Sequence, residues 1–168
     1  EVARFRVEHQ ERLAFHCYCQ FELDRQLSDC TGRARATGMT IGLYGDLALG
    51  TAADGFDTWA WPQLFAGGAS IGAPPDPLAP AGQDWALPPV RPRSLRDGGY
   101  EYWARLLRAA MSSVGAVRID HVMGLARQFW IPAGLPGSAG AYVRYPADEL
   151  FAVLALESHR HGVTVVGE

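Results

Sequence analysis

Two stretches of the chain repeat one order of features: an amphipathic helix, a glycine, an apolar strand and a carboxylate at the end of that strand. The first stretch predicts a helix over 100–111 and a strand over 116–120, and the second predicts a helix over 148–161 and a strand over 163–168. Helices that connect successive strands in this way produce parallel strands. Because parallel strands end on the same edge of a sheet, the repeat predicts both the type of sheet and the edge on which polar side chains gather.

A weaker copy of this unit precedes the other two. Gly38 ends a short helical stretch, 39–44 is predicted to be a buried strand, and Asp46 follows it. Alternating helices and strands predict an α/β fold, either a (β/α)8 barrel or a doubly wound sheet. Three strands cannot close a barrel, so the chain would form a segment of one. We expect Asp120 and Glu168, the carboxylates of the two clear units, to face one cleft.

Composition excludes several classes of function. The chain has 168 residues, of which 48% are hydrophobic and 20% charged, and this is typical of a globular domain with a core. A net charge of −3 argues against a protein that binds nucleic acid. No apolar run approaches the roughly 20 residues of a membrane span. We therefore expect neither nucleic acid nor a membrane as a partner.

The cysteines indicate a reducing compartment. Cys17, Cys19 and Cys30 are odd in number and lack the CxxC spacing, so we expect three reduced, half-buried thiols in a cytoplasmic protein. The chain has no paired set of cysteines and histidines to bind a metal ion, and no glycine-rich fingerprint that follows a strand and opens a helix. We therefore expect no metal and no cofactor.

The remaining segments complete one domain over 1–168. Apolar residues that recur every four positions predict one or two amphipathic helices over 1–30. The segment 50–96 carries most of the prolines and many aromatic residues, and we expect a long lid or substrate-binding loop there. A second loop is expected over 124–145. The chain lacks an initiator Met and stops on a strand-end residue, so we expect it to be a fragment of a longer protein.

The strand-end residues suggest a specific chemistry. Arg118 and Asp120 share one face of their strand, either as a structural ion pair or as a nucleophile that the guanidinium keeps ionised. In an apolar cleft beside another carboxylate, the pKa of Glu168 would rise, as a general acid requires. Two such carboxylates are what the chemistry of glycosidic bonds needs. His121 could bind a sugar hydroxyl or be structural, and Asp46 could hold the adjacent loop or contact substrate.

Several long motifs occur together with these residues. They are IGLYGDLALG at 41–50, ASIGAPPD at 69–76, GQDW at 82–85, RIDHVMGL at 118–125, FWIPAG at 129–134, GAYVRYP at 140–146 and VVGE at 165–168. With these motifs the chain resembles the bacterial 4-alpha-glucanotransferases, also called amylomaltases or disproportionating enzymes, of glycoside hydrolase family 77. The motifs are collinear with the family and cover essentially the whole chain, so chance agreement does not explain them.

The resemblance implies a (β/α)8, or TIM, barrel of the alpha-amylase clan, of which this chain would span about the third to the fifth strand. It implies that Asp120 is the catalytic nucleophile, that Glu168 is the general acid/base and that Arg118 orients Asp120. The other implied substrate-binding residues are His121 and Asp46 at the donor sugar, and Asp76, Gln83 and Trp85 on the loop that covers the cleft.

The implied reaction transfers segments of alpha-1,4-glucans, including maltooligosaccharides, to the 4-hydroxyl of an acceptor by retaining double displacement, as part of glycogen, starch and maltodextrin metabolism. The third catalytic Asp of the family would lie beyond Glu168, so we expect the isolated chain to have little or no activity. An incomplete barrel would also self-associate through its open strand edges. An alpha-glucan hydrolase of the same clan and a non-catalytic glucan-binding fragment remain alternatives.

Three residues depart from the family pattern. Gly45 stands where the family often has a larger residue, and Ala86 stands where glycine commonly follows the loop tryptophan. Phe21 stands where tryptophan often follows Gln20. Because the first two touch the loops, they bear on the preference for particular glucans rather than on the reaction.

Overall fold

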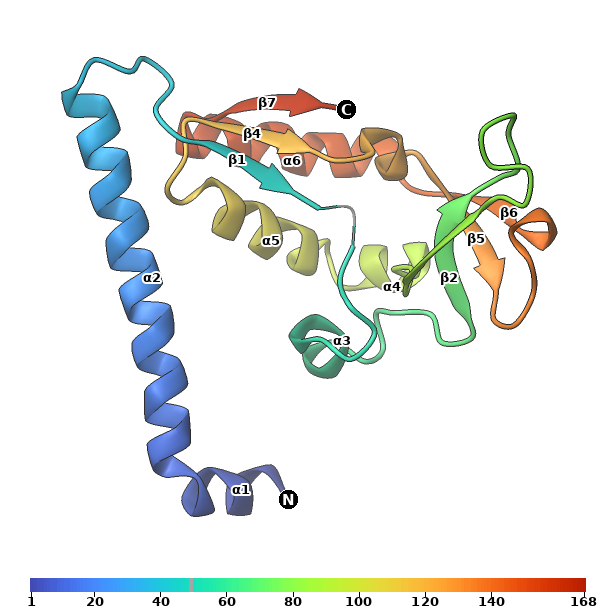
Figure 1. The fold of residues 1–168 in the computed structure, drawn as a ribbon, viewed down its shortest axis with the longest axis horizontal. Helices are drawn as coiled ribbons and strands as arrows, with labels where there is room; N and C mark the ends of the chain where they lie inside the picture. Colours follow the sequence, from blue (N-terminus) through green and yellow to red (C-terminus); the bar gives the residue numbers. More distant parts are fainter. Residues whose placement is uncertain (49) are drawn as a thin grey trace.

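The computed structural model describes residues 1–48 and 50–168. Its N-terminal helices stand away from a body that contains two separate sheets (Figure 1). One sheet is parallel and the other antiparallel, so the fold is α/β. The elements in chain order are α1 (Val2–Glu8), α2 (Gln10–Ala36), β1 (Tyr44–Leu47), α3 (Phe56–Ala60), β2 (Ala69–Ala73), β3 (Gln83–Leu87), α4 (Pro92–Asp97), α5 (Glu101–Met111), β4 (Ala116–Ile119), η1 (Val122–Leu125), β5 (Arg127–Pro132), η2 (Gly137–Ala139), β6 (Ala141–Arg144), α6 (Ala147–His161) and β7 (Thr164–Gly167).

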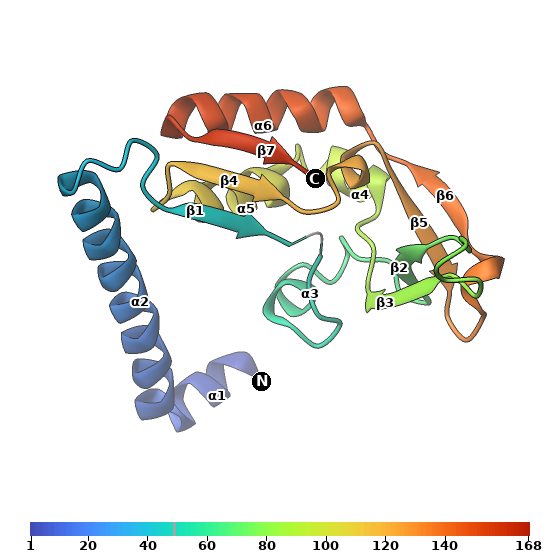
Figure 2. The ribbon, with the colours of Figure 1, turned by 45° about the horizontal axis from the view of Figure 1, so that its top comes forward.

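The parallel sheet has the order β1-β4-β7 and confirms the prediction from the repeated units. Its register places Asp46 beside Arg118 and Arg118 beside Val166. Helices α5 and α6 lie side by side and pack against the sheet (Figure 2). Val117 and Ile119 are buried in the core that these helices form. Since side chains alternate along a strand, Arg118 lies on the opposite face.

Apolar residues at intervals of four explain why α5 packs on the sheet. Trp103, Leu107 and Met111 form its buried face. The Trp103 Nε1–H donates a hydrogen bond of 3.1 Å to the carbonyl of Leu150, which ties α5 to α6. The core between the two helices and the sheet therefore sets the position of strand β4.

The ends of the helices match the sequence at α6 and differ from it at α5. Pro146 precedes α6, and Gly162 ends it in the left-handed conformation with φ 62°. Asp97 does not cap α5, because it is the last residue of the short helix α4. Tyr100 occupies the position before α5 with φ 60° and forms no side-chain cap.

The antiparallel sheet has the order β3-β2-β5-β6. Its strands come from 50–96 and 124–145, two segments that the sequence analysis described as loops and that instead contain regular structure. The sheet forms because β2 pairs with β5, a contact between residues far apart in the sequence. At Gly72 a β-carbon would lie 1.9 Å from the carbonyl oxygen of Gln83, so only glycine allows β2 and β3 to approach this closely.

The N-terminal helices contact the body sparsely. Thr31 is the one buried residue of α2, and its hydroxyl hydrogen-bonds the carbonyl oxygen of Ser113 at 2.5 Å. Cys17, Cys19 and Cys30 are unpaired and exposed, so the expectation of half-buried thiols is wrong. Apolar residues near them on α2, such as Phe15 and Phe21, are exposed as well. Within 1–48 and 50–168, no helix is both long enough and apolar enough to span a membrane.

The first strand begins later than predicted. Instead of 39–44, β1 covers Tyr44–Leu47, and Asp46 lies inside the strand rather than after it. Met39 and Ile41 are more than half exposed. Strand β1 is limited to the four residues that pair with β4, so the position of β4 decides where β1 begins and ends.

Candidate active site

Arg118, near the end of the central strand β4, gathers three carboxylates around one guanidinium. Its Nη1 donates to both oxygens of Asp46, at 2.7 and 2.9 Å. Its Nη2 donates to Asp120 Oδ1 at 2.7 Å and to Glu168 Oε2 at 2.9 Å. Asp46, Asp120 and Glu168 come from the ends of three neighbouring strands. The carboxylates of the two clear units therefore gather on one edge of the sheet, as predicted. Asp46 of the third, weaker unit lies with them.

Backbone hydrogen bonds continue past the strand ends and hold these carboxylates in place. The Asp120 N–H donates to the carbonyl oxygen of Leu47 at 3.0 Å, and the Glu168 N–H donates to that of Ile119 at 3.1 Å. The Val122 N–H in turn donates to the Glu168 carbonyl at 2.6 Å. The main chain at the edge of the sheet is thus ordered independently of the side-chain ion pairs.

The distances to Arg118 limit the separation of Asp120 and Glu168. Two oxygens that contact the same nitrogen, at 2.7 and 2.9 Å, cannot lie farther apart than the sum of those distances. One donor nitrogen therefore holds Asp120 and Glu168 close together at the edge of the sheet.

The site carries excess negative charge. The hydrogen bond that Arg118 donates to Asp46 raises the pKa of the guanidinium, and the charges of Asp46, Asp120 and Glu168 raise it further, so Arg118 remains protonated. One positive charge then faces three carboxylates. The side chains of Asp120 and Glu168 are 42% and 64% exposed. Glu168 is thus not enclosed in an apolar cleft by the described part of the chain.

Asp46 takes a role that the two sequence-based alternatives did not include. Its carboxylate binds Arg118 through both oxygens, and its contact with substrate stays a prediction. Arg118 itself is an ion-pair centre, as the spacing of Arg118 and Asp120 predicted. The sequence did not reveal that the same guanidinium also contacts Glu168.

His121 connects the carboxylate cluster to the antiparallel sheet. It follows Asp120 in the left-handed conformation with φ 48°, and its ring meets Trp85 edge to face at 5.2 Å between centroids. The Trp85 Nε1–H donates to Gln83 Oε1 at 3.0 Å. Three of the predicted substrate-binding residues, His121, Gln83 and Trp85, therefore lie together beside the carboxylates.

Asp76 is separate from this group. Its Oδ1 accepts hydrogen bonds from the backbone N–H groups of Leu78 and Ala79, at 2.7 and 2.6 Å. This arrangement closes a tight turn in the segment between β2 and β3. Asp76 therefore shapes the loop in this structure, and its implied contact with substrate stays a prediction.

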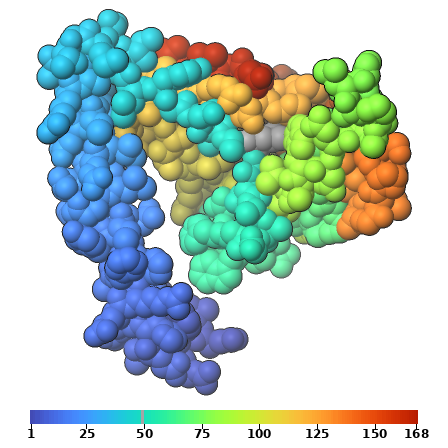
Figure 3. Space-filling view, viewed as in Figure 1, coloured from blue at the N-terminus to red at the C-terminus, as the bar shows by residue number. Residues whose placement is uncertain are grey.

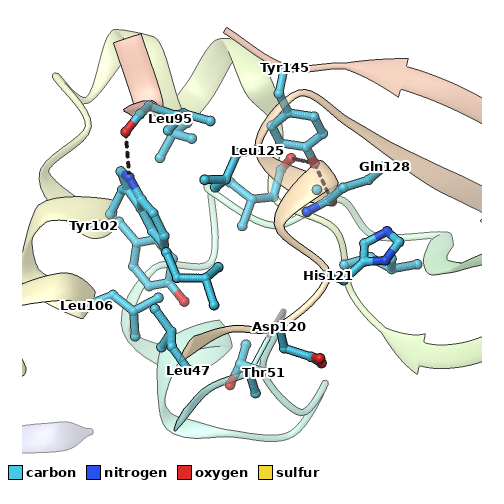
Figure 4. Close-up of a pocket in the computed structure, with 18 of the residues that line it drawn as sticks. Leu47, Thr51, Leu95, Tyr102, Leu106, Asp120, His121, Leu125, Gln128 and Tyr145 are labelled. Atoms are coloured by element: carbon cyan, nitrogen blue, oxygen red, sulfur yellow. Dashed lines mark hydrogen bonds between the residues drawn. The ribbon is translucent and has the colours of Figure 1, made fainter. Parts of the chain in front are cut away.

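A cavity of about 280 Å³ adjoins Asp120 and His121 (Figure 4). Its wall is mainly apolar, and it contains polar side chains that the sequence did not single out, among them Gln128 and Tyr145. The Tyr145 hydroxyl lies 2.7 Å from Gln128 Oε1 and 2.5 Å from the carbonyl oxygen of Val90. Burial raises the pKa of Tyr145, so the hydroxyl stays protonated. No local pattern indicated this pair, because β5 and the segment after β6 meet only in the folded chain.

The described residues contain no group of three or more His, Cys, Asp or Glu side chains arranged to hold a metal ion. The three carboxylates that meet at one edge are instead neutralised in part by Arg118. Their contacts are those of an ion-pair cluster.

Comparisons with known proteins identify the family of the chain. The model of glycoside hydrolase family 77, described as 4-alpha-glucanotransferase, matches residues 1–168, and the chain belongs to this family.

Relatives match over nearly the whole chain. A 4-alpha-glucanotransferase of Mycobacterium tuberculosis is 44% identical over 99% of this chain, and one of Haemophilus influenzae is 46% identical over 95% of it. The chain spans 23% of the length of each of these relatives.

Solved structures share the fold. The amylomaltase from Corynebacterium glutamicum superposes with a TM-score of 0.91 and 39% identity, over 94% of this chain and 22% of that one. The amylomaltase from Streptococcus agalactiae in complex with acarbose gives a TM-score of 0.87 with 22% identity, over 99% of this chain and 34% of that one.

Proposed function

We propose that this chain forms about the third to the fifth strand of the catalytic (β/α)8 barrel of a 4-alpha-glucanotransferase. The order of three parallel strands and the helices that connect them support this place in a barrel. The substrates are alpha-1,4-glucans and maltooligosaccharides. Three unpaired cysteines support a cytoplasmic location, because such thiols are typical of a reducing compartment.

One observation carries the proposed mechanism: Asp120 and Glu168 contact the same nitrogen of Arg118. In a retaining double displacement, Glu168 protonates the glycosidic oxygen while Asp120 attacks the anomeric carbon. The bond from that carbon to the leaving glucan breaks as the bond to the Asp120 oxygen forms. Arg118 orients Asp120, and Asp46 in turn holds Arg118.

The second step decides between transfer and hydrolysis. Glu168, now a base, takes the proton from the 4-hydroxyl of an acceptor glucan, whose oxygen displaces Asp120 from the anomeric carbon. Transfer requires that the acceptor is held and water excluded. We assign these tasks to the segment within 50–96 that carries Asp76, Gln83 and Trp85. The edge-to-face contact of Trp85 with His121 supports a position of Trp85 beside the donor site.

Maltotriose tests the proposed function in the complete protein. A transferase converts it to glucose, maltotetraose and longer chains, whereas a hydrolase of the same clan yields only maltose and glucose. Chromatography of the products separates these outcomes. A protein that binds maltotriose without converting it would support the alternative of a non-catalytic glucan-binding protein.

The isolated chain of 168 residues provides a second test. We expect it to have little or no activity, because the family's third catalytic Asp would come from a later strand. Its open parallel sheet is expected to self-associate, since β1 and β7 are both edge strands in the described fold. Turnover by the purified chain at the rate of the complete enzyme would contradict this proposal.

A further inference from the structure

Two large aromatic side chains on the short helix α3 are exposed. Phe56 and Trp59 are 71% and 66% exposed. Their ring centroids lie 5.9 Å apart and their planes are inclined at 45°. Two neighbouring rings of this kind form one bent apolar surface, and exposed surfaces of this type often bind a ligand. Figure 3 shows the teal segment around α3 standing out from the body of the molecule.

The helix that carries these rings is firmly anchored. Asp57 accepts a hydrogen bond of 3.3 Å from the Tyr102 hydroxyl on α5. The Thr58 hydroxyl lies 2.9 Å from the carbonyl oxygen of Gly55 and 3.0 Å from that of Ala53. A helix of five residues is too short to be stable alone, so these contacts fix its orientation. The two rings are therefore presented in a defined position.

The position of α3 relates it to the carboxylate cluster. It lies in the connection that follows β1, at the carboxyl end of the strand that carries Asp46. Thr51 and Asp57 of this connection line the same cavity as Asp120 and His121. The aromatic pair is thus attached to a segment that forms one wall of the site. Connections at this edge commonly bind substrate in barrels of parallel strands.

We propose that Phe56 and Trp59 form an accessory platform that binds a remote stretch of an α-1,4-glucan whose reacting bond lies at Asp120. The choice of ligand rests on the proposed function. A sugar ring presents a flat patch of C–H groups that stacks on an aromatic ring, and the indole N–H of Trp59 can donate to a hydroxyl. Successive α-linked sugars form a curved chain, which fits two inclined rings better than two coplanar ones.

Kinetics of the complete protein with substrates of different length test the platform. We compare the double variant Phe56→Ala/Trp59→Ala with the unchanged protein, using maltotriose and maltoheptaose. The ratio of kcat/KM for maltoheptaose to that for maltotriose is expected to fall about tenfold, because only the longer glucan reaches the platform. Phe15→Ala/Tyr18→Ala on α2 is the matched control, since these rings are 61% and 60% exposed. Its ratio is expected to stay unchanged.

Binding of β-cyclodextrin, a closed ring of α-1,4-linked glucose, supplies an independent measurement. Calorimetry is expected to show binding by the control and by Asp120→Asn, and at least about tenfold weaker binding by the platform variant. An unchanged ratio together with unchanged binding would overturn the inference. The inference would also be overturned if the platform variant bound cyclodextrin normally but changed its oligomeric state or melting temperature. The two rings would then pack against protein rather than glucan. If maltotriose is not converted but cyclodextrin binding depends on the platform, the proposed reaction fails and the platform stands.

Discussion

The chain contains two ion-pair clusters with opposite arrangements. At the edge of the parallel sheet, one arginine, Arg118, is surrounded by three carboxylates. Between α5 and α6, one carboxylate, Glu157, is surrounded by three basic side chains. Its Oε1 lies 2.8 Å from Arg108 and 3.0 Å from Arg160, and its Oε2 lies 3.8 Å from His161 Nδ1.

The difference between these clusters is one of charge balance and exposure. The Glu157 side chain is only 1% exposed, and the basic groups around it compensate its charge. The carboxylates around Arg118 are exposed to between 42% and 64%, and they exceed its single positive charge. A buried, compensated carboxylate ties elements together, whereas accessible carboxylates held in one orientation are available for chemistry. The following predictions test this division of roles in the complete protein.

Asp120→Asn is expected to have the largest effect. The amide preserves the shape of the side chain but cannot act as the nucleophile, so glucan transfer should fall about a thousandfold or more. The melting temperature should change little, because Asp120 is partly exposed. Product analysis with maltotriose measures glucan transfer, and calorimetry measures the melting temperature. Activity near that of the unchanged protein would mean that the nucleophile is another residue.

Arg118→Lys is expected to reduce kcat about a hundredfold, because small displacements of reacting groups are costly and an ammonium lacks the planar fork of a guanidinium. Lysine cannot reproduce the separate contacts of Nη1 with Asp46 and of Nη2 with Asp120 and Glu168. A purely structural arginine would instead lower stability and leave kcat of the folded protein unchanged.

Glu157→Gln should change stability rather than catalysis. The substitution keeps the volume but removes the charge that Arg108 and Arg160 share, and we expect a loss of about 1–2 kcal/mol in the free energy of unfolding. Denaturant titration measures this loss, and maltotriose turnover should remain unchanged below the melting transition. Reduced turnover by fully folded protein would show that the two clusters are not independent.

We also expect the ion pairs of Glu157 to make stability depend on pH. The hydrogen bond from Arg108, aided by Arg160, lowers the pKa of Glu157 below its ordinary 4.5. A carboxylate with a lowered pKa stabilises the fold above pH 4.5, and this contribution disappears as pH falls through the folded-state pKa. The difference in stability between the unchanged protein and Glu157→Gln should therefore shrink below pH 4.5. A difference that grows on acidification would contradict the sign.

The smallest effect is expected for Glu149→Gln, which is the control for Glu157. Glu149 pairs with Arg96 at 2.7 Å, but their side chains are 44% and 61% exposed. Exposed pairs contribute little because water and salt screen them. We expect no measurable change in the denaturation midpoint. A loss equal to that of Glu157→Gln would show that burial does not distinguish the ion pairs of this chain.

Local sequence patterns predicted the parallel part of the fold well. Residues three or four positions apart form the buried face of α5, which contains Trp103, Leu107 and Met111. The left-handed glycine that ends α6 is also a local feature. Such signals do not depend on the rest of the fold. The same reasoning failed where distant segments meet, as in the pairing of β2 with β5. It predicted the N-terminal helices correctly, but not that the cysteines of α2 are exposed.

For the site, the sequence by itself determined which carboxylates end the strands and on which edge they gather. Successive helix–glycine–strand units produce parallel strands, whose carboxyl ends lie on the same edge of the sheet. Only the tertiary structure decided that one guanidinium joins Asp46, Asp120 and Glu168, and that Trp85 meets His121. These contacts depend on strand register and on the packing of two sheets. Both are set by interactions between residues far apart in the sequence, which no local pattern records.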